Sequence, residues 1–477
     1  MDCRSRRKTG IQNLHPYFGH SYPRITRNNS MKITHIIFTL GLMCLLPLQG
    51  GPLTLEQALQ KALEDNKELK LARADLQLAD ARVTEAWSSV FPHIATDINY
   101  TRNLSDQFIY INGGFGGQTG PTRFSFTFKN EYSLRTQLNQ TLYSFGKVGT
   151  ALDIAYDYEK YVRALFRYQK EQILIKVEEA FYQTWIARQI FQLARESEAA
   201  AKENYQRTKI QFESGVRSEL ALLQAEVRWR SAIPEALAAR NGYELALNSL
   251  KNMLNIPVND SLEVQGRLDL PDVLPAKVPL ESALQKRPDF QARLLEARMR
   301  DKNVDLEFAN HLPDLSGQLT YTYSGRSDAF KLENDYDNYV LGVSLHIPLF
   351  SGGYTSAQVQ KARVDAAKTH IQVARLQDQI ATELENVHLS LEESFKQIKS
   401  AERAVTAARR AYELANAQSQ AGHVTQLELK DARIVWDQAR IARLNALFTY
   451  HKALLKWRLV TGSYMDTQTQ TKMQEHS

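Results

Sequence analysis

The stretch RFSFTFKNEYSLRTQLNQ, residues 123–140, alternates between apolar and polar side chains. The polar and charged residues mostly occupy one parity, and the other holds the apolar set: Phe124, Phe126, Phe128, Tyr132, Leu134 and Leu138. A period of two over about sixteen residues predicts a β-strand with one apolar and one polar face.

The same alternation returns in residues 339–347, with the apolar set Tyr339, Leu341, Val343, Leu345 and Ile347. Shorter alternating segments precede both stretches, around Ile94–Tyr100 and Leu315–Tyr323. The sequence therefore predicts two strands in each of two distant regions, four in all.

Other phrases also occur twice. LEQALQK at Leu55–Lys61 and LESALQK at Leu280–Lys286 differ at one position, and LYSFGK at 142–147 matches LFSGGY at 349–354. A tandem duplication explains this order of matches. The predicted organisation is a first repeat over 52–260, a linker over 261–278, a second repeat over 279–462 and a polar tail over 463–477.

Each repeat also predicts long helices around its strands. A helix precedes the strands, at 54–90 and 279–311, and a helical hairpin follows them, at 148–214 with 217–254 and at 354–421 with 424–460. The first arms are nearly free of Gly and Pro, and at about 1.5 Å per residue each spans roughly 100 Å.

The first fifty residues form a separate N-terminal extension. Met31-Lys32 precedes an apolar run, Ile36–Leu48, and small residues follow at Gly50 and Gly51. This pattern predicts a signal peptide starting at Met31, and the alternative is a buried strand or helix. Both cysteines lie in this extension, which leaves no disulfide or thiolate metal site in the mature chain.

Charge and motifs exclude several function classes. The extension holds seven basic side chains and one acidic side chain, which leaves 52 of each sign in the remainder. A balanced charge does not indicate a nucleic-acid partner. The chain also has no P-loop, HExxH or nucleophile elbow. We therefore expect no enzymatic activity, no catalytic residues, no cofactor and no metal.

The strands behind a signal peptide predict a membrane barrel. Four strands cannot close in lipid, where each open edge leaves backbone groups unsatisfied, and the smallest barrels use about eight strands. Three chains would supply twelve. The apolar face is expected to meet lipid: Phe124, Phe126, Phe128, Tyr132, Leu134, Leu138, Tyr339, Leu341, Val343 and Leu345. The alternative, a non-channel coiled-coil scaffold of the periplasm, fits the helices equally well.

Taken together, residues 52–462 resemble the TolC-like outer-membrane efflux proteins. The resemblance rests on the duplicated phrases, on VFPHI and HLPDL before the strands, and on the hairpin tips FESGVRSELALLQ and SQAGHVTQLELKD. It implies a mainly α fold with a small β-barrel portion: a homotrimer with a twelve-stranded outer-membrane barrel above a tunnel of long helical hairpins in the periplasm. The implied function is a passive exit duct for tripartite efflux or type I secretion.

The resemblance also implies partners and sites. The partners are outer-membrane lipid, a periplasmic adaptor protein and an inner-membrane pump of the RND or ABC type. The adaptor-contact tips are Ser214, Gly215, Val216, Ala421, Gly422, His423 and Val424, although turn chemistry alone also explains the glycines. Glu428 and Asp431 match an acidic ring at the periplasmic gate, and the alternative is a solvated helix face.

Overall fold

The computed structural model describes residues 52–112, 121–125, 127–268, 273–420 and 425–464. The predicted signal peptide and its start at Met31 lie outside these ranges. The first repeat contains α1 (Leu55–Asp65), α2 (Lys67–Ser88), β1 (His93–Arg102), β2 (Phe108–Asn112), β3 (Pro121–Ser125), β4 (Asn130–Tyr143), α3 (Lys147–Glu213) and α4 (Glu219–Met253). The second contains α5 (Leu280–Lys286), α6 (Pro288–Phe308), a 3₁₀ turn (Ala309–His311), β5 (Asp314–Ser327), β6 (Tyr336–His346), α7 (Tyr354–Gln420) and α8 (Gln426–Val460).

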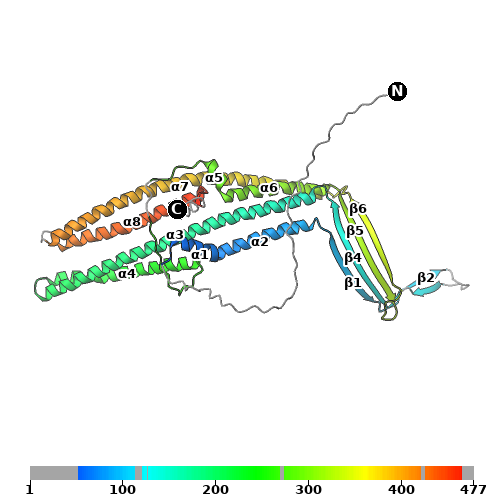
Figure 1. Ribbon diagram of the computed structural model, residues 1–477, viewed down its shortest axis with the longest axis horizontal. Coiled ribbons are helices and arrows are strands. Elements are labelled where there is room, and N and C mark those ends of the chain that lie inside the picture. The colour runs from blue at the N-terminus through cyan, green and yellow to red at the C-terminus, as the bar shows by residue number, and fades with distance from the viewer. Residues whose placement is uncertain (1–51, 113–120, 126, 269–272, 421–424, 465–477) are drawn as a thin grey trace, which may run out of the picture. The chain divides into compact units, whose positions relative to one another are not determined.

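The two repeats are built to the same dimensions. α3 and α7 each contain 67 residues, and the returning helices α4 and α8 each contain 35. Each pair packs as an antiparallel hairpin, and the strands lie at the ends of α3 and α7 that are remote from the hairpin turns (Figure 1). The predicted duplication and the mainly α fold are confirmed.

The leading helix of each repeat is divided, whereas the sequence predicted one continuous helix. Asn66 separates α1 from α2, and its extended backbone lets its side chain accept a hydrogen bond from the Leu69 amide. Arg287 separates α5 from α6 because it precedes Pro288, and a residue before proline is disfavoured in the helical region. Asn66 Nδ2 also donates to the Met253 carbonyl at the end of α4, 2.9 Å away. The returning helix therefore abuts the leading helix end to end.

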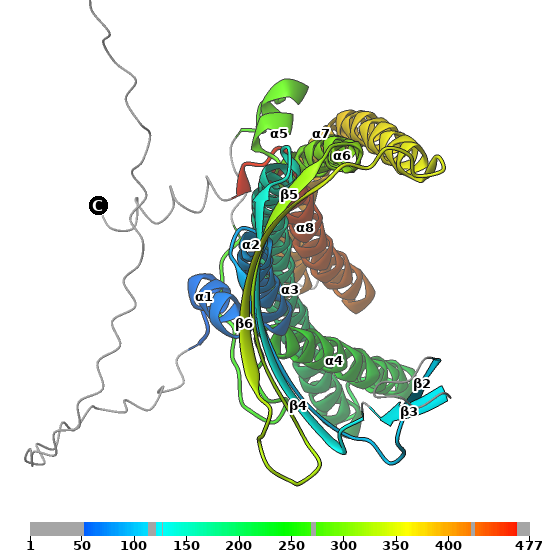
Figure 2. The same ribbon diagram turned by 90° about the vertical axis from the view of Figure 1, so that its right-hand side faces the viewer.

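Four strands form one antiparallel sheet in the order β1-β4-β5-β6. The central β4–β5 pairing joins the two repeats, and β1 and β6 are the edges. Seen along the molecule, the sheet is a curved, twisted band (Figure 2). Its strands begin or end within a few residues of α2, α3, α6 and α7, so the helices fix where each strand starts.

The strand predicted over residues 123–140 is not continuous. β3 ends at Ser125 and β4 begins at Asn130, and β2 and β3 form a separate hairpin. Side-chain hydrogen bonds hold the break: Asn103 Nδ2 donates to the Phe128 carbonyl, and the Lys129 amide donates to Asp328 Oδ1. Phe124 therefore lies in the hairpin and Phe128 between strands, while Phe126 lies outside the described residues. This corrects the placement of these phenylalanines in the sheet.

Buried polar contacts tie the first repeat to the second. Asp157 on α3 is 2% exposed; Arg298 Nε on α6 donates to its Oδ2 at 2.8 Å, and Lys302 Nζ lies 2.9 Å from the same atom. Farther along α3, the Tyr464 hydroxyl donates to Glu178 Oε2 at 2.9 Å. Tyr464 is fully buried, although the sequence assigned it to the polar tail. The signal that was missed is the single large aromatic residue after Gly462.

Burial alone would raise the pKa of Asp157, but the hydrogen bonds and charges of Arg298 and Lys302 outweigh it and lower the pKa below its ordinary value of 3.8. A depressed carboxyl pKa adds stability above the unfolded-state pKa, and that stability is lost as pH falls through the folded-state pKa.

Asp157→Asn is expected to destabilise the helical body by about 2 kcal/mol at pH 7, because charged hydrogen bonds to two cations are lost. Unfolding of the purified protein, followed by circular dichroism, measures the midpoint shift. The difference in unfolding midpoint between the variant and the wild type should narrow as pH falls below 3.8, since the Asp157 carboxyl group is then increasingly neutral. Asp153→Asn is the control, because its side chain is 66% exposed and lies 3.5 Å from Lys302. Equal midpoints for Asp157→Asn and Asp153→Asn at pH 7 would contradict this assignment.

Candidate functional site

The strand register gathers the apolar side chains on one face of the sheet. Ile94 pairs with Leu138, Leu138 with Leu319, and Leu319 with Leu341, so one apolar row crosses all four strands. Directly paired residues of antiparallel strands share a face. The positions that were predicted to meet lipid, and that the structure describes on this face, are Tyr132, Leu134, Leu138, Tyr339, Leu341, Val343 and Leu345.

The opposite face is polar and carries charges of both signs. Asp97 pairs with Arg135, and Glu131 pairs with Arg326. Gln137 and Thr320 pair with each other on the same face, next to Arg135. The sheet therefore separates an apolar surface from a polar, charge-balanced one.

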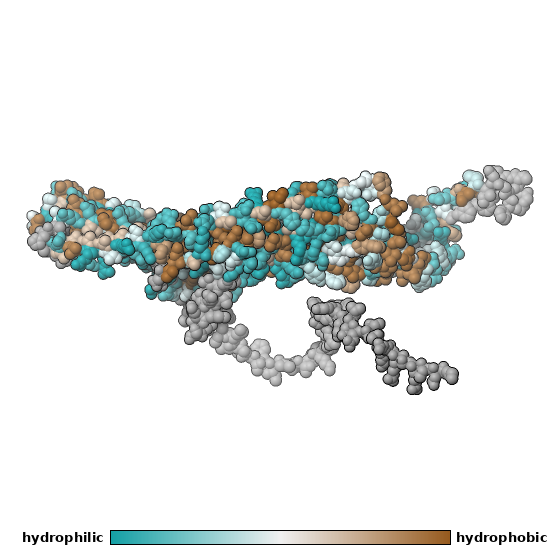
Figure 3. All heavy atoms as spheres, turned by 90° about the horizontal axis from the view of Figure 1, so that it is seen from above, coloured by the Kyte–Doolittle hydropathy of each residue, from teal (hydrophilic) through white to brown (hydrophobic). Residues whose placement is uncertain are grey.

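The apolar face is exposed within a single chain. Leu341 is 78% exposed, and hydrophobic residues gather over the strands (Figure 3). β1 and β6 each pair on one side only, so both edges present unpaired backbone groups. An exposed apolar face with two open edges marks an interaction surface. None of the described helices is long and apolar enough to cross a membrane.

The tip of the first hairpin is a tight turn at Ser214, Gly215 and Val216. Gly215 adopts φ +73°, in the left-handed region that favours glycine, and Val216 is 72% exposed. Ser218 then caps α4 by accepting a hydrogen bond from the Ala221 amide. The corresponding residues Ala421, Gly422, His423 and Val424 lie outside the described residues.

Glu428 and Asp431 lie in the first turns of α8, and both are exposed. Glu428 also has a local structural role: its Oε2 accepts hydrogen bonds from the Thr425 amide at 2.8 Å and from Thr425 Oγ1 at 3.1 Å. Its own amide donates back to Thr425 Oγ1, which completes a capping box. Sequence reasoning assigned Glu428 to a gate and missed this helix cap, which the Thr425–Glu428 spacing signals.

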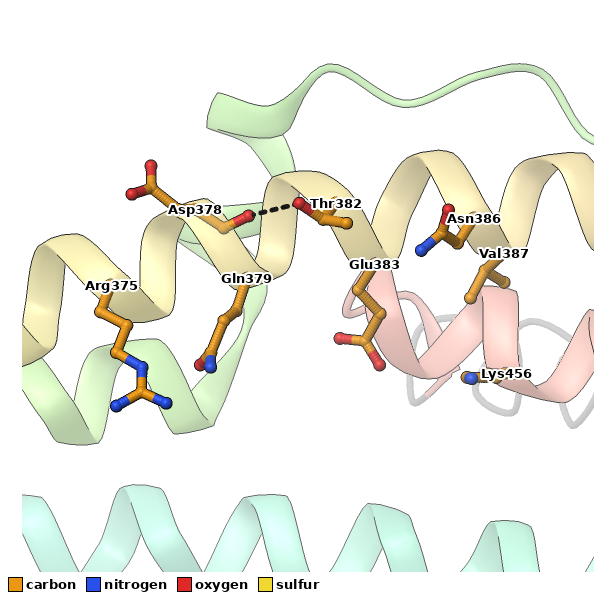
Figure 4. A pocket seen from close by; sticks show the side chains of 8 residues that line it. All are labelled: Arg375, Asp378, Gln379, Thr382, Glu383, Asn386, Val387 and Lys456. Carbon is orange, nitrogen blue, oxygen red and sulfur yellow. Dashed lines mark hydrogen bonds between the residues drawn. The ribbon is translucent and has the colours of Figure 1, made fainter.

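A shallow groove of about 420 Å³ lies along α7 beside α8 (Figure 4). It is lined by Arg375, Asp378, Gln379, Thr382, Glu383, Asn386, Val387 and Lys456. The charges are mixed, and Glu383 already accepts a hydrogen bond from Arg287 at 3.0 Å. The groove therefore has no set of like charges suited to a small ionic ligand. The described residues contain no cluster of three His, Cys, Asp or Glu side chains placed to hold a metal ion.

The duplication reveals a second interaction surface that sequence reasoning missed. α3 packs against α6 and α8 of the other repeat. The equivalent partners of α7 are α2 and α4, and within the described chain α7 makes no comparable contact with either. One side of α7, and the matching sides of α2 and α4, are therefore left open.

The open sides carry apolar residues whose repeat counterparts are buried. Ile371 on α7 is 68% exposed, whereas its counterpart Ala164 on α3 is fully buried. Leu71 on α2 is 69% exposed, whereas its counterpart Ala292 on α6 is 1% exposed. Larger apolar groups at exposed positions equivalent to buried ones indicate an interface with another molecule. A residue-by-residue comparison of the repeats would have revealed these exchanges of alanine for a larger apolar residue from sequence.

Solved structures share this arrangement. The chain superimposes on the CmeC outer membrane channel of Campylobacter jejuni with a TM-score of 0.72 and 17% identity, covering 91% of this chain and 94% of that one. It superimposes on the open-state MtrE outer membrane channel of Neisseria gonorrhoeae with a TM-score of 0.69 and 20% identity, covering 86% and 88%. The fold is that of this class of channel subunit.

The model of the outer membrane efflux protein family matches residues 58–255 and 280–463, one segment in each repeat. The chain therefore belongs to the outer membrane efflux protein family, which is not a class of enzymes. The alkaline protease secretion protein AprF of Pseudomonas aeruginosa is 27% identical over 210 residues, 43% of this chain and 44% of that protein. TolC of Vibrio cholerae is 21% identical over 316 residues, 65% and 67% respectively.

Gly215→Ala is expected to loosen the first hairpin tip, since the left-handed conformation costs a residue with a Cβ about 1 kcal/mol. Hydrogen exchange of the amides around residues 211–219 should become faster. Gly242→Ala is the matched control: Gly242 lies inside α4 with open space around it, so alanine should slow exchange there. If hydrogen exchange at the tip is unchanged in Gly215→Ala, the left-handed φ of Gly215 does not determine the stability of the turn.

Proposed function

We propose that three copies of this chain form a passive exit duct in the outer membrane that extends into the periplasm. One observation carries this proposal: a four-stranded sheet with two unpaired edges, one apolar face and one polar face. In lipid, unpaired backbone groups cost several kcal/mol each, so the sheet is stable there only as part of a closed barrel. Edge β1 of one copy pairs with edge β6 of the next.

The number of copies follows from barrel size. Two copies supply eight strands, an interior that side chains fill, whereas three supply twelve and leave a lumen. The apolar residues then face lipid, and the polar face with Asp97, Arg135, Glu131 and Arg326 lines the lumen. The same ring buries the open side of α7 against α2 and α4 of a neighbouring copy. A repeated head-to-tail interface of this kind closes into a ring.

The duct operates with partners that supply energy. The chain offers no nucleotide-binding motif, so we propose that an inner-membrane pump of the RND or ABC type drives transport and that a periplasmic adaptor contacts the hairpin tips. The relatives of this chain include both a protease secretion protein and an efflux pump outer membrane protein. Both tripartite efflux and type I secretion are compatible with a polar lumen. A periplasmic scaffold is disfavoured, because it would not require an exposed apolar sheet face.

Leu341→Arg is expected to impair membrane insertion, because an arginine at mid-bilayer on a lipid-facing strand costs about 2–4 kcal/mol. Membrane fractionation and native electrophoresis should show less assembled protein in the outer membrane. Gln137→Arg is the matched control, since Gln137 lies on the polar face of the same sheet and should insert normally. Normal insertion of Leu341→Arg, or failure of both variants, argues against a lipid-facing apolar surface.

The acidic ring is tested by removing charge without removing the helix cap. Glutamine can replace Glu428 in the capping box, so Glu428→Gln with Asp431→Asn changes six charges per trimer and preserves the start of α8. Planar-bilayer recordings should show cation selectivity falling by severalfold in this double variant. Glu413→Gln on α7 is the control for a charge outside the proposed ring. Unchanged selectivity in the double variant would remove Glu428 and Asp431 from the gate, and a wild-type protein without conductance would overturn the duct itself.

A further inference from the structure

The loop between β5 and β6, residues 328–335, folds back over the apolar face of the sheet. It connects the ends of these two strands that are remote from the helices (Figure 1). Gly325 pairs with Tyr132 and therefore shares its face. A Cβ on Gly325 would lie 3.5 Å from the Glu333 carbonyl oxygen and 3.8 Å from Leu332 Cδ2, which both belong to the loop. The loop thus covers Gly325 on the apolar side of the sheet.

Two further contacts hold the loop on this side. The ring of Phe330 packs edge-on against two tyrosines of the apolar face, with its centroid 5.8 Å from that of Tyr100 and 6.1 Å from that of Tyr132. The hydroxyl of Tyr323, on the same face, donates a hydrogen bond to Asp335 Oδ2 at 2.8 Å. The loop is therefore fixed against the apolar face, away from the polar one.

The loop presents apolar and charged side chains in alternation. Phe330 is 74% exposed and Leu332 is 61% exposed, although both lie against the apolar face. Lys331 and Glu333 alternate with them in the sequence. Such a segment suits the boundary of a bilayer, where apolar side chains meet acyl chains and charged side chains reach the headgroups. Because the loop carries charges of both signs, apolar contact is what it offers to lipid.

The position of the loop along the sheet matches the outer boundary of a membrane. The apolar face begins near Leu315, which pairs with Leu345, and Gly325 follows Leu315 by ten residues on β5. At about 3.4 Å per residue and a strand tilt of about 40°, these ten residues rise about 26 Å. The apolar band of a membrane barrel is about 25 Å tall. The loop over Gly325 therefore lies where acyl chains end and headgroups begin.

We propose that residues 328–335 form a membrane anchor, in which Phe330 and Leu332 insert into the outer leaflet at the boundary between acyl chains and headgroups. The proposal rests on the proposed duct, because it requires the apolar face of the sheet to meet lipid. Lipid is the occupant that fits, since Phe330 and Leu332 continue the apolar surface that meets lipid below them. A loop anchored on the lipid side cannot fold across the polar face, so the anchor also keeps this loop out of the mouth of the duct.

Single-cysteine labelling of the full-length protein tests the anchor. Cys3 and Cys44 are the two cysteines of the chain, so serine at both positions gives a background without thiols. Phe330→Cys and Leu332→Cys are each labelled with a nitrobenzoxadiazole fluorophore in vesicles of phosphatidylethanolamine and phosphatidylglycerol. Lipid with a nitroxide near the headgroup should quench both labels about threefold more than lipid with a nitroxide at the end of the acyl chain. Aqueous iodide should quench them about threefold less than the label at Lys331→Cys, the matched control in the same loop.

Labels on the sheet separate failure of the anchor from failure of the duct. The label at Leu341→Cys, within the apolar face, should be quenched mainly by the nitroxide at the end of the acyl chain. The label at Gln137→Cys, on the polar face, should be quenched mainly by iodide. If the labels at positions 330 and 332 are as open to iodide as the Lys331→Cys label, while the Leu341→Cys label reports acyl chains, the anchor is overturned and the duct stands. If the Leu341→Cys label is also open to iodide, the proposed function fails.

Phe330→Ser tests the anchor without a fluorophore. In nanodiscs of the same lipids, hydrogen exchange of the amides in residues 328–335 should become about tenfold faster, because the loop loses its contact with lipid. Phe330→Trp keeps an aromatic ring and should exchange at the wild-type rate. In an amphipathic polymer without lipid, the effect of Phe330→Ser should be smaller, since only the contacts with Tyr100 and Tyr132 are lost. An equal effect in nanodiscs and in polymer would make Phe330 an internal packing residue and would overturn the anchor.

Discussion

The structure depends on the hydrogen bonds that β1 and β6 lack. A four-stranded sheet in water can leave its edges to solvent, but the same sheet with a broad apolar face has to satisfy those groups in lipid by pairing. Neither edge can pair within the chain, because β1 and β6 lie at opposite ends of the sheet. In the proposed duct the barrel is therefore a property of the assembly, and the helices beneath it must hold the copies at the spacing that edge pairing demands.

The duplication gives each chain two similar repeats, so contacts within a chain and contacts between copies can have nearly the same spacing. Contacts such as Asp157 with Arg298 hold α3 of the first repeat against α6 of the second inside one chain. In the proposed ring, the contact between copies uses the equivalent sides with different side chains, since exposed Ile371 replaces buried Ala164 and exposed Leu71 replaces buried Ala292. A ring with nearly equivalent joints can close without strain concentrating at the boundaries between subunits.

The sequence predicted the elements whose periodic pattern extends over many residues. It failed at the boundaries that single side chains determine. Alternation in residues 130–139 and the near absence of glycine and proline in α3 and α7 identified the strands and hairpins. The divided leading helices depend on the cap of Asn66 and on Pro288, which interrupt otherwise continuous helical patterns. The break before Asn130 depends on hydrogen bonds from Asn103 and to Asp328, which are remote in sequence and carry no periodic signal.

The equal lengths of α3 and α7 restrict how this protein can change. Deleting one residue near the base of α7 would turn everything beyond it by about 100° and draw the tip inward by about 1.5 Å. The residues beyond the deletion would then face a different side of α7, and α7 would be one residue shorter than α3. Removing two full turns, seven residues, preserves the azimuth but shortens one hairpin by about 10 Å. A viable shortening must therefore remove matched segments from both arms of both hairpins, so the length of the helical body changes in coordinated steps.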